Sequence, residues 1–194
     1  KGGLSLNGLS RLSDALAESI SEFRCEEISL SGLTHISDKA AESLTKFKGK
    51  IGIWGLNEIS ENVARSLAEH KGGWVSERCN GDEPLDFFSL KQLNPQVAKY
   101  LLKIKEGLYF GKYSFDEISD EVADILSKYT GGLDLAGLKK LSDQAAESFS
   151  KYNGEYLSFE CLTELSDTAC KSLAKVNPEK LNLPYIESKV AKYR

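Results

Sequence analysis

Apolar and polar residues follow two periods along this chain, and the pair of periods recurs. A tripeptide with apolar first and third residues, such as ISL at 28–30, precedes a Gly-Leu pair, and Ser-Asp and a longer apolar pattern follow. Alternate side chains of a strand point to opposite faces, so the tripeptide predicts a short strand with one buried face. The spacing of Ala40, Leu44 and Phe47 places them on one face of a helix. Each unit therefore predicts one strand followed by one helix.

The unit occurs eight times at a nearly constant period. Its tripeptides begin at Leu4, Ile28, Ile51, Leu85, Leu108, Leu133, Leu157 and Leu181. The spacing is 23 to 25 residues except for 34 between Ile51 and Leu85. This period is too short for the common two-helix repeats and fits one strand plus one helix per coil. The long spacing predicts one regular period with an insertion at 72–84.

A serine followed by an acidic residue opens almost every predicted helix. The hydroxyl of Ser37 can accept from an unpaired amide of the first turn, and Asp38 lies where the helix dipole favours negative charge. The equivalent serines are Ser13, Ser60, Ser119, Ser142 and Ser166. Asn94 and Pro95 occupy these two positions in the fourth unit, where both are acceptable. The Ser-Asp pairs are therefore expected to be structural.

Three segments, LTHISDKAAESL, LTELSDTACKSL and LKKLSDQAAESF, carry a family resemblance. They resemble the Leu-x-x-Ile-Thr-Asp-x-Gly-x-x-x-Leu half of the cysteine-containing leucine-rich repeats found in F-box proteins, and bacterial arrays have similar repeats. The resemblance covers essentially the whole chain. The repeats here are slightly shorter and carry glycine where that subclass has cysteine, with Cys161 the exception. The resemblance implies a horseshoe fold and a partner-binding habit, but no F-box and no ubiquitin chemistry.

We expect an α/β fold, a right-handed leucine-rich-repeat solenoid formed as a single domain over residues 1–194. Seven full units and a truncated eighth would place short parallel strands on the concave side and helices on the convex side. Residues 184–194 leave the pattern and are expected to form a short helical end cap. The opening KGGLSLNGL matches TGGLDLAGL at 130–138, so we expect the chain to be a piece of a longer protein with further repeats upstream.

Composition narrows the classes of partner. A net charge of -4 and a pI near 5.4 argue against nucleic acid, which needs a contiguous basic face. No apolar run approaches the roughly 20 residues that a membrane helix needs, so we expect a soluble protein. The sequence leaves its cellular compartment open. Cys25, Cys79, Cys161 and Cys170 lack the spacing of a zinc site or a disulfide framework and are expected to be free, reduced thiols.

The outward positions of the strands change character along the array. They are small in the first two units, and aromatic or acidic residues follow. The candidate binding residues are Trp54, Asp86, Phe88, Tyr109, Asp134, Tyr156 and Glu160. Since parallel strands lie ~4.8 Å apart, we expect an exposed aromatic patch with acids beside it, which is typical of a binding surface. Alternatively, Trp54 and Phe88 cover each other or seal the base of the insertion.

Two irregular segments lie beside this patch. The insertion, GGWVSERCNGDEP, is expected to project from the coil and to offer Trp74, Glu77 and Arg78 as contacts, although a loop without a role remains an alternative. The fifth unit has two additional residues before its helix, so either Tyr113 or Phe115 takes the inward corner position and the other can join the surface.

No constellation of catalytic groups, metal ligands or phosphate-binding glycines stands out, so we expect no enzyme, no cofactor and no metal. His70 occupies a position held elsewhere by phenylalanine or tyrosine and is expected to pack under a helix end. We expect a non-catalytic module that binds a protein or peptide on its concave face. Carbohydrate binding by the same face, or a spacer role in a longer array, are the alternatives, and the oligomeric state stays open.

Overall fold

The computed structural model describes residues 2–76 and 84–194, in which short strands and helices alternate. The strands are β1 (Leu4–Ser5), β2 (Glu27–Ser29), β3 (Lys50–Gly52), β4 (Leu85–Phe87), β5 (Leu108–Phe110), β6 (Leu133–Leu135), β7 (Leu157–Ser158) and β8 (Leu181–Asn182). The helices are α1 (Asp14–Ser21), α2 (Asp38–Leu44), α3 (Glu61–Glu69), α4 (Pro95–Leu101), α5 (Asp120–Leu126), α6 (Asp143–Phe149), α7 (Asp167–Leu173) and α8 (Glu187–Ala191), with a 3-10 turn η1 (Pro178–Lys180) before β8.

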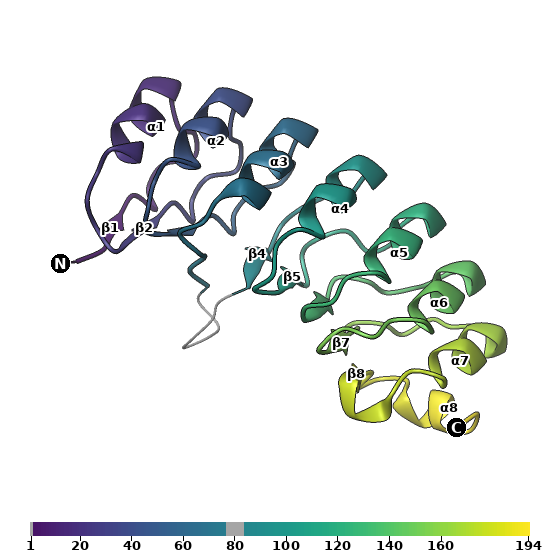
Figure 1. The fold of residues 1–194 in the computed structure, drawn as a ribbon. Coiled ribbons are helices and arrows are strands. Elements are labelled where there is room, and N and C mark those ends of the chain that lie inside the picture. The colour runs from purple at the N-terminus through teal and green to yellow at the C-terminus, as the bar shows by residue number, and fades with distance from the viewer. Residues whose placement is uncertain (1, 77–83) are drawn as a thin grey trace.

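All the paired strands are parallel and fall into two sheets. One sheet has the order β1-β2-β3, and the other has the order β4-β5-β6-β7-β8. The first residues of the tripeptides lie opposite one another, so that Ile28 pairs with Ile51 and Leu108 pairs with Leu133. Figure 1 shows an arc with α1 to α7 side by side along its outer side and the strands along its inner side. The chain therefore has a repeat α/β fold.

The core fills the space between strands and helices along the whole arc. In the second unit Ile28, Leu30 and the corner residue Leu33 are fully buried, as are Ala40 and Leu44 of the helix that covers them. The equivalent residues of neighbouring units belong to the same cluster. Each unit thus completes its core with side chains of the next, as the recurring pattern predicts.

The Ser-Asp pairs join adjacent units as well as capping helices. The hydroxyl of Ser60 accepts from the amide of Val63 at 3.0 Å and donates to Asp38 Oδ1 of the preceding unit at 2.5 Å. The same side-chain bond joins Ser37 to Asp14, Ser142 to Asp120 and Ser166 to Asp143. Hydrogen bonds from Ser60 and Asn62 lower the pKa of Asp38. The pair is structural, and its hydrogen bonds form a ladder along the array.

The sheet is interrupted between β3 and β4, where the insertion begins. Ile51 donates its amide to the Gly73 carbonyl at 3.1 Å and accepts from Val75 at 3.0 Å, so Trp74 lies opposite Ile51. The separation of Ile51 and Trp74 is one regular period of 23 residues. Thus the segment around Trp74 pairs with β3, whereas β4 pairs with β5. The segment around Trp74 and strand β4 therefore divide between them the two sets of contacts that a single strand makes in the other units.

This arrangement corrects the expected placement of the insertion. Trp74 was expected in a projecting loop, and that placement is wrong because its side chain is 3 % exposed and belongs to the core. It fills the inward position that a leucine fills in other units. Glu77 and Arg78 lie outside the described residues. The serine-aspartate ladder stops at the same place, because Asn94 and Pro95 replace the serine and the acid.

The last unit is covered by the segment after β8. Ile186 and Val190 are buried against the preceding unit, and Lys189 Nζ lies 3.7 Å from Asp167 Oδ1. Lys189 also donates to the carbonyl oxygen of Leu165 at 2.5 Å. Residues 184–194 therefore cover this end of the array. No helix in the described parts of the chain has both the length and the apolar character needed to cross a membrane.

Candidate functional site

The middle residues of the strands form a row on the inner side of the arc. In the larger sheet Asp86 lies opposite Tyr109, which lies opposite Asp134, and Ser158 follows. The smaller sheet has Ser5, Ser29 and Gly52 in the same row. Tyr109 thus stands between two aspartates at the ~4.8 Å spacing of adjacent strands. The aromatic and acidic side chains are concentrated on the larger sheet.

The exposure of the candidate residues differs from the expected open patch. Asp86 and Tyr109 are each only 6 % exposed. Trp54, Phe88 and Asp134 are half-buried. Tyr156 is 41 % exposed, and Glu160 is also exposed. The accessible part of the inner face is therefore smaller than the alternation of residues predicts.

Three of the aromatic rings lie on glycines. A Cβ atom added to Gly111 would approach Cδ2 of Phe88 to 2.6 Å, and one added to Gly132 would approach Cδ1 of Tyr156 to 2.8 Å. The ring of Trp54 approaches Gly52 in the same way, at 2.5 Å. A glycine leaves a ring room to lie against the backbone. The missing side chains thus fix where the rings lie.

The enlarged corner of the fifth unit adds one more ring to this face. Tyr113 meets Phe88 edge to face with their centroids 5.1 Å apart, and it is 54 % exposed. Its carbonyl oxygen accepts from Lys91 Nζ at 2.8 Å. Phe115 takes the inward position and packs against Phe110 at 5.2 Å. The alternative left open by the sequence is resolved with Tyr113 on the surface.

A hollow of about 320 Å³ opens beside this row, and we call it the acidic hollow. It is lined by Ser76, Pro84, Glu106, Gly107, Leu108, Tyr109, Gly132, Asp134, Glu155 and Tyr156. Gly107 and Gly132 stand directly before their strands, where the neighbouring units have Pro84 and Tyr156. The hollow exists because these two glycines carry no side chain. Among the lining residues that the structure describes, three are acidic and none is basic.

Two tyrosines from helix ends support the floor of the acidic hollow. The hydroxyl of Tyr129 accepts from the Gly107 amide at 3.1 Å, and that of Tyr152 donates to the Tyr156 carbonyl at 2.9 Å. Burial raises the pKa of Tyr129, and the nearby carboxylates of Glu106 and Glu155 raise it further. The phenol therefore stays neutral at pH 7 and feels a negative field from the hollow.

The prediction from the outward strand positions did not include Glu106 and Glu155. Each lies two residues before its strand, and the predicted outward row began one residue later. The signal available in the sequence was that both acids occupy the same position in units two periods apart. Of the predicted residues, the hollow brings together Tyr109, Asp134 and Tyr156. Trp54, Asp86, Phe88 and Glu160 do not line it.

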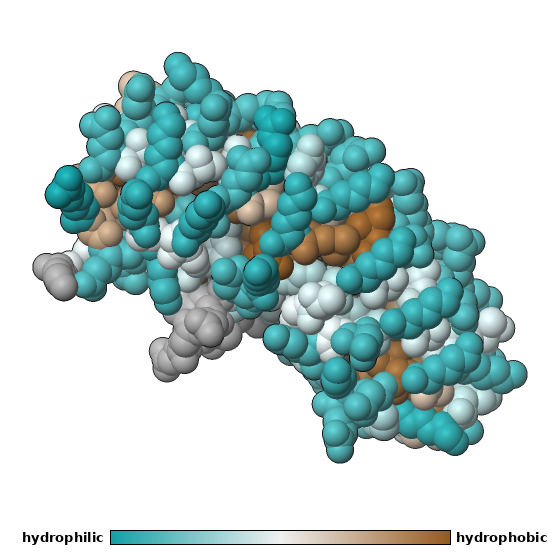
Figure 2. Space-filling view, in the orientation of Figure 1, coloured by the Kyte–Doolittle hydropathy of each residue, from teal (hydrophilic) through white to brown (hydrophobic). Residues whose placement is uncertain are grey.

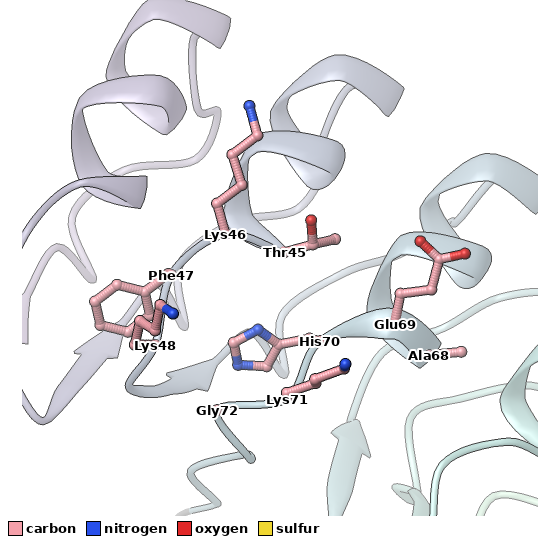
Figure 3. Close-up of a pocket in the computed structure, with 9 residues that line it drawn as sticks. All are labelled: Thr45, Lys46, Phe47, Lys48, Ala68, Glu69, His70, Lys71 and Gly72. Atoms are coloured by element: carbon pink, nitrogen blue, oxygen red, sulfur yellow. The ribbon is translucent and has the colours of Figure 1, made fainter.

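A second hollow lies on the flank of the array, where α2 and α3 end, and is shown in Figure 3. His70 Nε2 lies 3.2 Å from the Gly49 carbonyl oxygen, and the imidazole centroid lies 5.2 Å from the ring of Trp74. The side chains of Lys46 and Glu69 point away from the imidazole. Burial lowers the pKa of His70. The histidine packs and forms a hydrogen bond at a helix end, the position that Tyr129 and Tyr152 hold in later units.

Within residues 2–76 and 84–194, no three His, Cys, Asp or Glu side chains are grouped so that they could hold a metal ion. Cys25, Cys161 and Cys170 are free thiols, and Cys79 lies outside the described residues. Burial raises the pKa of the Cys170 thiol, as befits a residue that takes an alanine position in its helix. Cys170 belongs to the core, and Cys25 is partly buried against it.

The sequence was also compared with known families and proteins. No protein-family model matches the chain, and no curated protein matches its sequence.

Proposed function

We propose that this chain is a non-catalytic module that binds a protein segment along the inner face of its arc. The observation that carries the proposal is the pair of exposed rings on this face, Tyr156 held against Gly132 at the acidic hollow and Tyr113 packed edge to face on Phe88. Tyr113 and Tyr156 are among the few large aromatic side chains that remain well exposed in the described residues. Aromatic side chains placed in advance lose little conformational freedom on binding and dominate many protein interfaces.

We further propose that the repeat fold is a right-handed leucine-rich-repeat solenoid with a horseshoe shape. The parallel strands, the corner leucines and the recurring strand-helix order support this assignment. In such an array each unit contacts mainly its neighbours, and the inner strands form an extended surface. The inner face would be about 34 Å long at ~4.8 Å per strand, enough for an extended peptide or a protein edge.

Carbohydrate is the second candidate ligand. The exposed ring of Tyr156 stands beside Asp134 and Glu155 at one hollow, and an aromatic face next to carboxylates can hold a sugar ring. Protein is favoured because a second exposed ring of this face, Tyr113, belongs to a separate cluster with Phe88. Two separate anchor points suit a ligand that extends along several strands.

The proposal is tested by affinity capture with the wild-type chain and a Tyr113→Ala, Tyr156→Ala double variant. The source lysate and a glycan array are the two probes. Tyr185→Ala is the matched control, because Tyr185 is 70 % exposed and lies near the C-terminal end, outside the row. We expect a protein that is retained by the wild type and the control and is lost with the double variant. Glycan binding lost with Tyr156→Ala would favour carbohydrate, and equal retention by all variants would contradict an inner-face site.

A further inference from the structure

The two ends of the array differ in how they are covered. At the C-terminal end residues 184–194 cover the last unit, and Asp167, the acid that opens α7, lies 3.7 Å from Lys189 of that segment. At the N-terminal end β1 is the outermost strand of its sheet, and α1 is the outermost helix (Figure 1). No described residue covers the outer side of this first unit. The one undescribed residue there, residue 1, cannot cover a surface that reaches from β1 to the end of α1.

The outer side of the first unit exposes side chains of the kind that form the core elsewhere. Leu4, Leu6 and Leu9 are only partly buried, whereas their equivalents in the second unit are fully buried. Leu16 is 37 % exposed, and Phe23 is 53 % exposed although the phenylalanine at the same position of the next unit is 2 % exposed. We call these five residues the N-terminal face. Because the positions are the same in both units, the added exposure reflects the lack of a neighbour on the outer side.

A backbone donor at the corner of the first unit points to the same place. In later units the amide of this corner residue donates to a carbonyl oxygen of the unit before it, from Thr34 to Ser10 at 3.1 Å and from Asn57 to Thr34 at 3.1 Å. Ser10 holds this position in the first unit. No carbonyl oxygen of a described residue accepts from the Ser10 amide. This amide is therefore directed toward the position that a preceding unit would hold.

The serine-aspartate ladder also has an open end here. The hydroxyl of Ser13 accepts from the amide of Leu16 at 3.2 Å, as the other capping serines do. Ser37 and Ser60 each donate in addition to the acid that opens the preceding helix. Among the described residues no helix and no acid precede Ser13 in this way. Its hydroxyl can thus donate to an acidic residue at the start of one more helix.

These groups together indicate what kind of element covers the N-terminal face. A strand edge, an outward amide and a capping hydroxyl are spaced here as they are at the junctions inside the array, so they fit a strand-helix unit whose helix opens with an acid. A second copy of the chain fits less well, because its C-terminal end is covered and Asp167 already pairs with Lys189. The segment GGL at 2–4 matches GGL at 131–133, which leads from α5 into β6.

We propose that the N-terminal face is the interface for a preceding strand-helix unit of the same repeat, carried by the same polypeptide. The strand of this unit pairs with β1, its helix packs on Leu16 and Phe23, and the acid that opens its helix accepts from Ser13. The described arc is then part of a longer array, in which the polar outer surface that an end needs lies farther along. This inference does not depend on the function proposed for the inner face.

The first test adds one unit to the full chain. A copy of residues 108–129 is joined before residue 1, so that Lys1 takes the position of Thr130. The copied Asp120 then precedes Ser13 by 22 residues, the separation of Asp120 from its own serine partner in the natural array. The matched control carries the same added residues in a shuffled order.

Hydrogen exchange, followed by NMR, reports whether the added unit docks. The observed amides are those of Ser10 and Ser5, whose equivalent Val75 donates to the preceding unit. We expect exchange at both amides to be at least roughly tenfold slower with the native copy than with the shuffled one. Equal exchange in the two proteins would overturn the proposal. The amide spectrum of the other units shows in both proteins whether the arc is retained.

The ladder gives a second readout that depends on register. Ser13→Ala should reduce the folding equilibrium constant roughly fivefold more in the extended chain than in the natural chain, because only the extended chain has an acid for the hydroxyl to meet. Replacing the copied Asp120 by alanine should remove this difference. An equal effect of Ser13→Ala in both chains, measured by urea unfolding, would contradict the proposed register.

The natural occupant can be identified from the coding sequence upstream of residue 1. We expect an apolar tripeptide 23 to 25 residues before Leu4, and an acidic residue 22 or 23 residues before Ser13, as at the other junctions. A coding sequence without them would overturn the proposal. A dimer of the natural chain in which the Ser5 and Ser10 amides are protected, detected by light scattering and exchange, would also overturn it, since a second copy would then be the occupant.

Discussion

The ring of Tyr156 lies across the backbone of Gly132, where an added Cβ atom would come within 2.8 Å of Cδ1. The two residues stand directly before neighbouring strands, β7 and β6. The pair therefore holds a 41 % exposed ring at the edge of the acidic hollow. Here the absence of a side chain in one unit determines the position of a side chain in the next.

Gly132→Ala should displace this ring while leaving the fold intact. The backbone at Gly132 needs no left-handed conformation, so the methyl group acts on the ring and on the volume of the hollow. We expect a stability change below ~1 kcal/mol and weaker capture of the partner that the wild type retains. Gly8→Ala is the control, since its Cβ would meet nothing within 4 Å. Unchanged Tyr156 ring resonances together with undiminished binding would show that the contact does not position the ring.

The serine-aspartate ladder predicts that two similar helix-cap substitutions lower the free energy of unfolding by unequal amounts. Ser60→Ala removes both a helix cap and the bond to Asp38, whereas Ser119→Ala removes a cap only, because Pro95 replaces the acid in the unit before it. We expect losses of about 1–2 kcal/mol and about 0.5–1 kcal/mol, measured by urea unfolding. In an Asp38→Ala background the two losses should become similar. Equal losses in the wild-type background would contradict a ladder that couples units.

His70 predicts a pH dependence of stability. Burial lowers its pKa below the ordinary 6.5, so the unfolded chain binds the proton more readily than the folded chain. The stabilisation from the neutral imidazole is complete above pH 6.5 and is lost as pH falls through the folded pKa. His70→Phe, with the side chain that Phe47 has in the preceding unit, should lose less stability between pH 7.5 and pH 5 than the wild type. His35 stays in both proteins, so an identical loss would exclude a contribution from His70.

Trp74 should behave as a core residue. It is 3 % exposed and pairs with Ile51 at the break between the sheets. We expect Trp74→Ala to destabilise the chain by about 3–5 kcal/mol and Trp74→Phe by less. Tyr113→Ala, at an exposed ring, should stay within ~0.5 kcal/mol. A small effect of Trp74→Ala in thermal or urea unfolding would contradict its placement in the core.

The regular part of the fold could be predicted from the sequence because each position recurs with the same chemistry. Leucine or isoleucine begins every strand tripeptide, and a serine or asparagine caps helices α1 to α7. The core position of Trp74 was not predicted, because the segment WVS at 74–76 ends on Ser76 where other units have an apolar residue. Ser76 is nevertheless buried, so a polar third residue hid a regular strand position.

The site could be predicted only in part. Alternation predicts that Asp86 and Tyr109 face the inner side, but it does not predict that each is only 6 % exposed. The acidic hollow exists because Gly107 and Gly132 have no side chain. A glycine directly before a strand does not by itself predict a hollow. Sequence periodicity gives the direction of a side chain, whereas its accessibility depends on the packing between units.

Site-specific photo-crosslinking compares the two sides of the arc directly. A benzophenone amino acid is placed at Tyr113 on the inner face or at Glu42 on the outer helix surface, and each protein is irradiated in lysate of its source cell. The account predicts a discrete crosslinked protein from position 113 that is absent from position 42 and is suppressed by Tyr156→Ala. The same crosslinked protein from position 42, with none from position 113, would contradict binding on the inner face.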